Sequence, residues 1–282
     1  MNNNNIILID ASYTSFHRFY ATLRWFSFSN KEEYKKYKED KDYDWTTNKI
    51  FIEKYEKMYL ESIIKLIKKK VYKDSILIFC QDSPQQSIWR HEFVKCYKGK
   101  RVDHSEKINI KSVFKYTYEH IIPTLAKEKH IFKLMVPKME GDDVIAVISK
   151  YVRKKLPEKK VYIISGDKDF YQLGYPNLYF ADYKKKEMLN FTRQEAKQKL
   201  LEKIVDGDCS DNIPSIFKDI KISKQEKDKL KNNKKDLILF LNKKENKKIK
   251  KNYKLNRKAI NFKYIPKIYQ KKVLKEIENI FH

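Results

Sequence analysis

Cysteine is rare in this sequence, with only Cys80, Cys96 and Cys209 among 282 residues. The three show no paired spacing, which argues against a disulfide framework and a zinc knuckle and favours a reducing compartment. Long apolar runs are missing too, since none approaches the roughly 18 residues of a membrane span. The N-terminus has no basic segment, and its apolar run ends at Asp10, so we expect no secretory signal. These absences predict a soluble, intracellular protein with no membrane partner.

Glycine and proline are scarce, with 5 and 7 residues, and negative charge is in the minority. The 63 Lys and Arg outnumber the 37 Asp and Glu, which gives a formal net charge of +26. Such an excess indicates a polyanionic partner, nucleic acid first and anionic membrane second. The coding bias of an A/T-rich genome would produce the same composition. The charge alone therefore leaves both explanations open.

Apolar, β-branched runs with the pattern of buried parallel strands alternate with helical patterns. The expected strands are residues 6–9, 75–80, 131–136 and 161–164, with a weaker fifth at 177–181. The expected helices are residues 51–69, 113–125 and 144–156. This alternation predicts an α/β fold with a three-layer α/β/α core, in which helices cover both faces of a mainly parallel sheet.

The chain changes character after about residue 190, where it becomes Lys-rich and has no strong strand pattern. Residues 224–235 and 242–251 are almost wholly polar, so they could be exposed loops or stay disordered until nucleic acid binds. The charged segment 30–44 is expected to be a solvated insertion or a frayed helix. We therefore expect an α/β domain at 1–190 and a small, basic, all-helical subdomain at 191–282.

Nine carboxylates gather in five short clusters of this basic chain. They are Asp10, Asp82, Glu140, Asp142, Asp143, Asp167, Asp169, Asp208 and Asp211. The first four clusters end an apolar run or open a helix just after one, and such strand ends share one edge of a parallel sheet, where ligands bind. Each cluster alone could be a turn or a helix N-terminus. Together they would repel, by roughly 4 kcal/mol per pair at about 4 Å, which predicts a shared cation site.

Oxygen ligands without His or Cys favour Mg²⁺ or Mn²⁺ over zinc. Two such ions about 3.5–4 Å apart can activate a water and hold the leaving oxygen of an in-line phosphoryl displacement. An acidic pocket of this kind inside a basic protein is typical of a nuclease. We expect two Mg²⁺ ions, for which Mn²⁺ substitutes.

The motifs around these acids resemble those of the flap endonuclease and 5′-exonuclease family, whose nuclease core is PIN-like. The matching stretches are Ile9-Asp10, Asp82, Trp89-Arg90, Tyr97-Lys98-Gly99-Lys100-Arg101, Glu140-Gly141-Asp142-Asp143, Ser165–Phe170 and Gly207–Pro214. Residues 255–266 resemble the C-terminal stretch of the T-even phage ribonuclease H. The resemblance covers residues 6–266, nearly the whole chain.

The resemblance implies a role for each of the nine carboxylates. The implied ligands of a first, catalytic ion are Asp10, Asp82, Glu140, Asp142 and Asp167. The implied ligands of a second ion are Asp143, Asp169, Asp208 and Asp211.

Basic and aromatic residues are implied to contact the substrate. Arg90, Lys98 and Arg101 lie at the base of an arch segment, about 88–115, and are expected to reach the scissile phosphate and the 5′ strand. Solvated positions on an exposed helix are the alternative for these cations. Phe16 either stacks on a base near the cut or is a core aromatic on the first helix.

Two departures from the family pattern leave parts of the interface open. The glycine-rich hairpin that normally follows Asn-Ile-Pro is replaced by residues 215–221, which contain no glycine. Close approach of the backbone to duplex phosphates is harder without glycine. The arch segment 102–111 is short, so the sequence does not decide whether a 5′ end threads through it.

The function that the resemblance implies is hydrolysis of phosphodiesters at 5′ ends or 5′ flaps of DNA or RNA–DNA hybrids. The expected partners are DNA with a 5′ flap, nick or RNA primer, together with replication proteins, and the expected state is a monomer. Primer removal during replication of an A/T-rich virus or phage would be the setting. The alternatives are a PIN-type ribonuclease, which shares the acidic sheet edge, and a catalytically silent junction-binding protein, which typically loses ligands.

Overall fold

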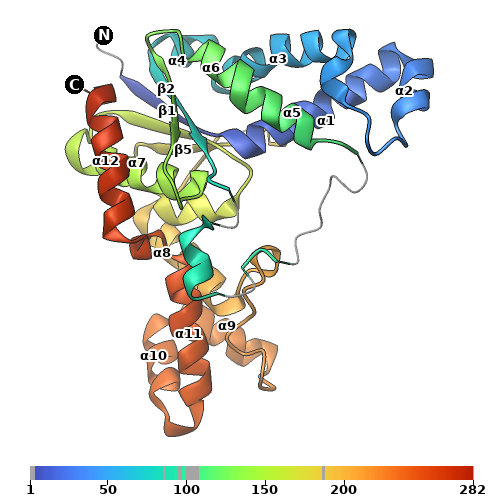
Figure 1. Ribbon diagram of the computed structural model, residues 1–282. Helices are drawn as coiled ribbons and strands as arrows, with labels where there is room; N and C mark the ends of the chain where they lie inside the picture. The colour runs from blue at the N-terminus through green and yellow to red at the C-terminus, as the bar shows by residue number, and fades with distance from the viewer. Residues whose placement is uncertain (1–3, 85–86, 95–96, 100–107, 186–187, 282) are drawn as a thin grey trace.

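The computed structural model describes residues 4–84, 87–94, 97–99, 108–185 and 188–281 (Figure 1). Its strands are β1 (Asn5–Asp10), β2 (Ser75–Gln81), β3 (Ile131–Met135), β4 (Lys160–Ile164), β5 (Leu178–Ala181) and β6 (Leu189–Asn190). They form a six-stranded sheet in the order β3-β2-β1-β4-β5-β6. The first five strands are parallel, and β6 pairs antiparallel with β5. All five predicted strands are confirmed to within one residue; β6 was missed because two residues show no alternation.

Helices cover both faces of the sheet. Those that do so are α1 (Ala11–Ser29), α3 (Lys49–Ile67), α7 (Gly141–Lys155) and α12 (Lys267–Phe281). In β1, Ile6 and Leu8 belong to the core beneath α7 and α12, whereas Ile7 and Ile9 belong to the core beneath α1 and α3. Successive side chains of a strand point to opposite faces, so a continuous apolar run fills two cores. The predicted three-layer α/β/α fold is confirmed (Figure 1).

The remaining predicted helix, 113–125, forms in three parts. These are α5 (Lys111–Tyr116), a π-helical turn (Thr117–Ile121) and α6 (Ile122–Leu125). Pro123 has no N–H to donate to the preceding turn, which accounts for the wider turn before it. The charged segment 30–44 contains α2 (Lys31–Tyr37), none of whose residues is buried.

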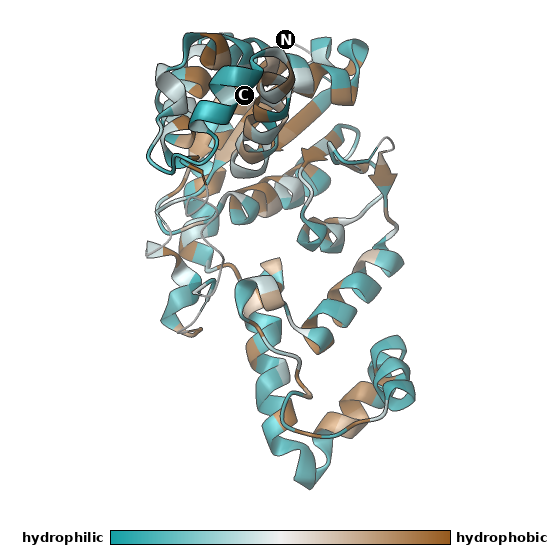
Figure 2. Ribbon diagram, turned by 90° about the vertical axis from the view of Figure 1, so that its right-hand side faces the viewer, coloured by the Kyte–Doolittle hydropathy of each residue, from teal (hydrophilic) through white to brown (hydrophobic). Residues whose placement is uncertain are grey.

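The polar segments 224–235 and 242–251 are helical, which corrects the expectation of loops or disorder. They contribute to α9 (Lys224–Asn232), α10 (Lys234–Asn242) and α11 (Lys247–Ile260), which follow α8 (Arg193–Asp206). Leu230, Leu237 and Ile249 pack there in a third small core. Figure 2 shows mostly hydrophilic residues along this extension below the sheet. Each helix contributes only a few apolar side chains, but together these side chains are enough to form one shared core.

The C-terminal helix α12 leaves this extension and returns to the sheet (Figure 1). Its residues Tyr269, Val273 and Ile277 lie in the core beneath α7. The boundary at residue 190 stays a prediction, but α12 belongs to the α/β core and not to a subdomain at 191–282. No helix in the described ranges is both long and apolar enough to cross a membrane.

Candidate metal centre

Asp10 joins two adjacent strand ends at the carboxyl edge of the sheet. It ends β1 and caps α1, with its Oδ1 accepting a hydrogen bond from the Tyr13 N–H at 2.9 Å. Its Oδ2 accepts from the Ser165 hydroxyl, just after β4, at 2.8 Å. Burial and the neighbouring charge of Asp82 raise the pKa of Asp10 to about 7, with Asp167 adding to the effect. These three carboxylates therefore share one electrostatic environment.

Asp82, just after β2, ties that strand to the start of α7. Its Oδ2 accepts from the Ser12 hydroxyl at 2.5 Å, and its Oδ1 accepts from the Gly141 N–H at 2.6 Å. The approach requires glycine, because a Cβ on Gly141 would lie 2.9 Å from the Cys80 carbonyl oxygen. The same contact places Glu140, Asp142 and Asp143 beside the strand ends.

Glu140, Asp142 and Asp143 form a compact cluster at the N-terminus of α7. Each offers a carboxylate oxygen, and these oxygens all lie within 4.8 Å of one another. The Oδ1 of Asp142 is buried without a hydrogen-bond partner among the described residues. Burial, followed by the charges of Glu140 and Asp143, raises the pKa of Asp142 well above its usual range. An all-oxygen group with an orphaned buried carboxylate oxygen fits a divalent cation.

Arg90 neutralises part of this cluster from inside the protein. Its Nη1 donates to Glu140 Oε2 and its Nη2 to Asp143 Oδ1, both at 2.7 Å. Its Nε donates to the Ala259 carbonyl at 3.0 Å, and Trp89 Nε1 donates to Asp143 Oδ2 at 2.7 Å. Because Arg90 is only 2% exposed, the expectation that it reaches the scissile phosphate does not fit. Its geometry suits a positioning residue that holds the carboxylates.

Lys98 and Tyr97 link the α7 cluster to Asp211. Lys98 forms an ion pair with Glu140, and its backbone N–H donates to the Asp211 carbonyl at 3.2 Å. The Tyr97 hydroxyl lies 2.9 Å from Glu140 Oε2 and 3.1 Å from Asp211 Oδ2. Burial opposes ionisation of Glu140, but Lys98 and Arg90 hold its pKa below the usual value. The third predicted cation, Arg101, lies outside the described residues.

A second cluster consists of Asp169, Asp208 and Asp211, whose carboxylate oxygens also lie within 4.8 Å of one another. Lys203 of α8 forms ion pairs with Asp169 and, at 2.8 Å, with Asp208 Oδ2. Burial opposes ionisation of Asp208, but hydrogen bonds from Lys203 and Ser210 lower its pKa. Three of the four carboxylates expected at a second ion are thus brought together. The fourth, Asp143, lies with the α7 cluster.

Most of the chain matches a known protein family. A family model described as the N-terminal resolvase-like domain of 5′-3′ exonuclease matches residues 5–201. The chain belongs to the 5′-3′ exonuclease family. This confirms the resemblance that the motifs indicated.

Two curated relatives of this exonuclease-family chain are much longer than the region they share with it. A 5′-3′ exonuclease of Mycoplasmopsis pulmonis is 30% identical over 166 residues, which cover 56% of this chain and 52% of that protein. The thermostable DNA polymerase I of Thermus thermophilus is 30% identical over 115 residues, which cover 41% of this chain and 12% of the polymerase. The chain therefore spans about half of the first relative and a small part of the second.

Solved structures from bacteriophage T5 share the fold over the whole chain. The T5 D15 protein co-crystallised with metal ions has a TM-score of 0.66 and 16% identity, and covers 98% of this chain and 99% of its own. The T5 flap endonuclease in a complex with DNA and metal ions has a TM-score of 0.61 at 16% identity, covering 98% of both chains. At this identity the match confirms the three-layer fold.

The remaining predicted residues of the exonuclease-family site lie at the surface or on the first helix. Asp167 is exposed, and its Oδ1 accepts from the Asp169 N–H at 2.8 Å. Phe16 is partly buried against the core beneath α1, with its ring 4.7 Å from that of Tyr20. This contact favours the core interpretation of Phe16. Tyr97 and Lys203 received no role from the sequence, although Tyr97 lies within a matching motif.

The charge on Asp10 predicts a stability effect in the absence of metal. Its folded pKa of about 7 exceeds the ordinary value of 3.8, so the folded state binds the extra proton and stability falls as pH rises between these values. The loss is at most about 4 kcal/mol and is complete above pH 7. Asp10→Asn, which keeps the helix cap, should therefore melt several degrees higher than wild type at pH 8 in EDTA.

Thermal melts at pH 8 and pH 3.5 test this expectation, and the gain should vanish at the lower pH. Asp42→Asn, at an exposed position, should change neither melt. Added Mg²⁺ should stabilise wild type more than the Asp10 variant. An Asp10→Asn melting temperature at or below wild type at pH 8 would show that burial and neighbouring charge do not disfavour the Asp10 carboxylate in the folded state.

Proposed function

We propose that this chain is a metal-dependent 5′ nuclease that hydrolyses phosphodiesters at 5′ ends or 5′ flaps of DNA or RNA–DNA hybrids. The observation that carries the proposal is the convergence of nine carboxylates from five separate sequence clusters on the carboxyl edge of the sheet and the adjoining α7 and α8 ends. The names of the relatives, including a T5 flap endonuclease with DNA and metal ions, support it.

The proposed ions are two Mg²⁺, for which Mn²⁺ substitutes, since the ligands that the two described clusters offer are carboxylate oxygens. Asp10, Asp82 and Asp167 would hold the first ion together with the α7 cluster. Asp169, Asp208 and Asp211 would hold the second. Bound ions would supply the positive charge that activates a water and stabilises the leaving oxygen.

The surrounding side chains would prepare these ligands. Arg90 and Trp89 hold Asp143 in one orientation. Tyr97 fixes the spacing between the two clusters by contacting Glu140 and Asp211. Lys98 is the more exposed of the two described cations, at 13% against 3% for the Arg90 side chain. Lys98 is therefore our candidate for contact with the scissile phosphate.

Metal-dependent cleavage of a labelled 5′ flap tests the proposed function. Flap, nicked duplex and RNA–DNA hybrid should be cut in Mg²⁺ or Mn²⁺ to products that carry a 5′-phosphate, and none should be cut in EDTA. Single-stranded RNA without a duplex is the comparison substrate. Cleavage of that RNA alone would favour a PIN-type ribonuclease, and flap binding without cleavage would favour the silent junction-binding protein.

We propose that one face of α11 binds duplex DNA. Lys247, Lys251 and Lys254 are exposed at four- and three-residue spacing, so they line one face of the helix. The opposite face is fixed by Asn256, whose Nδ2 donates to the carbonyls of Ile204 and Pro214 at 3.0 and 2.8 Å. The segment 215–221 contains no glycine, and its residues Ile216 and Phe217 are buried. We therefore propose that the lysine side chains of α11, and not glycine amides of this segment, contact the duplex.

Neutralising this lysine face should weaken the salt dependence of binding. Changing Lys247, Lys251 and Lys254 to Gln should reduce the slope of log K against log salt by about 0.9 for each phosphate that these lysines neutralise in the wild-type complex. A titration of labelled duplex at several salt concentrations measures this slope. The matched control changes three exposed lysines of α4 (Lys69–Lys73), which directly precedes β2 and so lies at the opposite edge of the sheet. Equal slopes for both triple variants would mean that the net positive charge of the whole protein, and not a face of α11, determines the salt dependence of binding.

Primer removal during replication of an A/T-rich viral or phage genome is the proposed setting, inside the host cell. The Lys- and Asn-rich, glycine-poor composition supports the genome type. The T5 relatives support a phage context. A monomer that meets replication proteins on DNA is the proposed state.

A further inference from the structure

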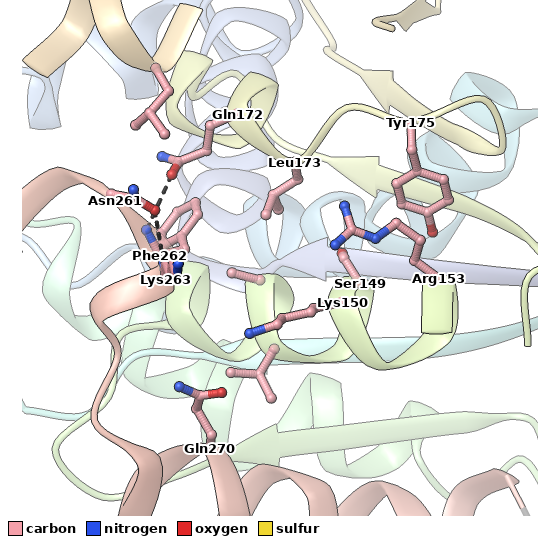
Figure 3. A pocket seen from close by; sticks show the side chains of 13 residues that line it. Ser149, Lys150, Arg153, Gln172, Leu173, Tyr175, Asn261, Phe262, Lys263 and Gln270 are labelled. Atoms are coloured by element: carbon pink, nitrogen blue, oxygen red, sulfur yellow. Dashed lines mark hydrogen bonds between the residues drawn. The ribbon is translucent and has the colours of Figure 1, made fainter. Parts of the chain in front are cut away.

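A cavity of about 320 Å³ lies beside α7 (Figure 3). Its lining residues come mainly from α7, the 3₁₀ turn Lys168–Leu173, α8, the 3₁₀ turn Phe262–Tyr264 and α12. Small-ligand pockets usually measure about 300–1,000 Å³. Ser149 in its wall follows Asp142 by two helical turns, or about 10 Å along α7. No carboxylate of the candidate metal centre lines the cavity, although the lining residues Ala146 and Gln172 follow Asp143 and Asp169 by only three residues.

The charged residues among those that line the cavity are all positive. Lys150 and Arg153 of α7 and Lys263 across from them are exposed lining residues, and none of the thirteen described lining residues is acidic. No ion pair within the described part of the chain involves any of the three. The Arg153 guanidinium lies over the Tyr175 ring, 5.8 Å from its centroid. Three cations without an ion-pair partner around one concave site favour an anionic ligand.

The lining of the cavity is largely apolar and includes two residues whose hydroxyls are buried within the protein. Leu173, Leu200 and Phe262 supply apolar surface. Ser149 and Tyr175 are 1% and 4% exposed, and neither hydroxyl has a hydrogen-bond partner among the described residues. A buried hydroxyl without a partner costs about 1–3 kcal/mol. Burial raises the pKa of Tyr175 to about 12, so this group stays a neutral donor at ordinary pH.

Hydrogen bonds fix parts of the cavity lining, and Figure 3 draws the one between Gln172 and Phe262. The Gln172 side chain donates to the Ile260 carbonyl at 3.0 Å and accepts from the Phe262 N–H at 3.1 Å. Gln270 of α12 donates to the Ile265 carbonyl at 2.6 Å. These bonds hold the wall in place before any ligand arrives, which reduces the entropy cost of binding.

We propose that this cavity binds a mononucleotide. Its phosphate would lie against Lys150, Arg153 and Lys263, and its planar base would cover the apolar interior. A free phosphate would leave the apolar surface uncovered, and an oligonucleotide would exceed the volume. The proposal does not depend on the nuclease function, because no carboxylate of the metal centre lines the cavity.

Calorimetric titration of the full chain in EDTA with thymidine 5′-monophosphate tests the proposal, with inorganic phosphate and thymidine as comparison ligands. We expect saturable one-to-one binding of the nucleotide, at least about tenfold tighter than either comparison ligand. The double variant Lys150→Ala/Arg153→Ala should bind at least about tenfold more weakly. The matched control Lys154→Ala/Lys155→Ala removes equal charge from exposed, non-lining positions of the same helix and should bind like wild type.

Three results would overturn the proposal. One is the lack of saturable nucleotide binding at millimolar concentration. Another is equal affinity for phosphate and nucleotide, which would mean an adventitious anion site only. The last is equal weakening by both double variants, which would mean attraction by bulk charge. Because EDTA removes divalent metal and no nucleic acid is present, failure here would say nothing about cleavage.

Discussion

Replacing Asp142 by Asn is expected to lower single-turnover cleavage of a 5′ flap by about a thousand-fold or more, with flap affinity changed only a few-fold. Asp142 has a buried oxygen without a partner, and it lies within the compact cluster with Glu140 and Asp143. An amide removes the negative charge that a divalent ion needs but keeps the size of the side chain. Phosphate contacts elsewhere set affinity, so binding should survive.

Asp42→Asn is the matched control for this loss of charge, because Asp42 is exposed and far in sequence from every cluster. It should cleave at the wild-type rate. Single-turnover cleavage in Mg²⁺ and flap binding in Ca²⁺ provide the two readouts. An Asp142→Asn protein that is folded and cleaves at the wild-type rate would remove the α7 cluster from the mechanism.

Replacing Arg90 by Ala should destabilise the fold by about 3–5 kcal/mol, because it leaves buried carboxylates without their counter-charge. Asp143 is fully buried, and its Oδ1 and Oδ2 accept hydrogen bonds from Arg90 at 2.7 and 2.9 Å. The guanidinium also packs over Trp89, at 4.6 Å, and the loss of this packing adds to the cost. Urea unfolding measures the difference.

Arg24→Ala on the exposed side of α1 is the control and should change the free energy of unfolding by less than about 0.5 kcal/mol. The double variant Arg90→Met/Asp143→Leu should recover much of the stability, since an apolar pair can replace a buried ion pair. If Arg90→Ala unfolds like wild type but cleaves slowly, the original expectation of a direct phosphate contact would be favoured over the positioning role.

The sheet and the acidic residues of the site can be predicted from the sequence because both depend on short, local sequence patterns. The runs that form β1 and β2 are apolar on both faces, and a parallel sheet aligns their ends, which places Asp10 and Asp82 at one edge. The separation into two clusters of three was also implied in part, since Asp169, Asp208 and Asp211 belong to the same predicted ligand set.

The partners of these acids could not be predicted, because they come from distant segments and have no local signal. Arg90 pairs with Asp143 across 53 residues, and its Nε donates to the Ala259 carbonyl of α11, 169 residues away. Lys203 looks like any other helix lysine in a Lys-rich chain. The return of α12 to the sheet also has no local signal, since its apolar spacing would suit either core.

Anomalous diffraction from crystals soaked in Mn²⁺ tests the central claim most directly, because it locates the ions without relying on activity. The account predicts two peaks at the carboxyl edge of the sheet. One should lie beside Asp142 and Asp10, and the other among Asp169, Asp208 and Asp211. Ordered Mn²⁺ elsewhere on the molecule, with no peak at either cluster, would contradict it.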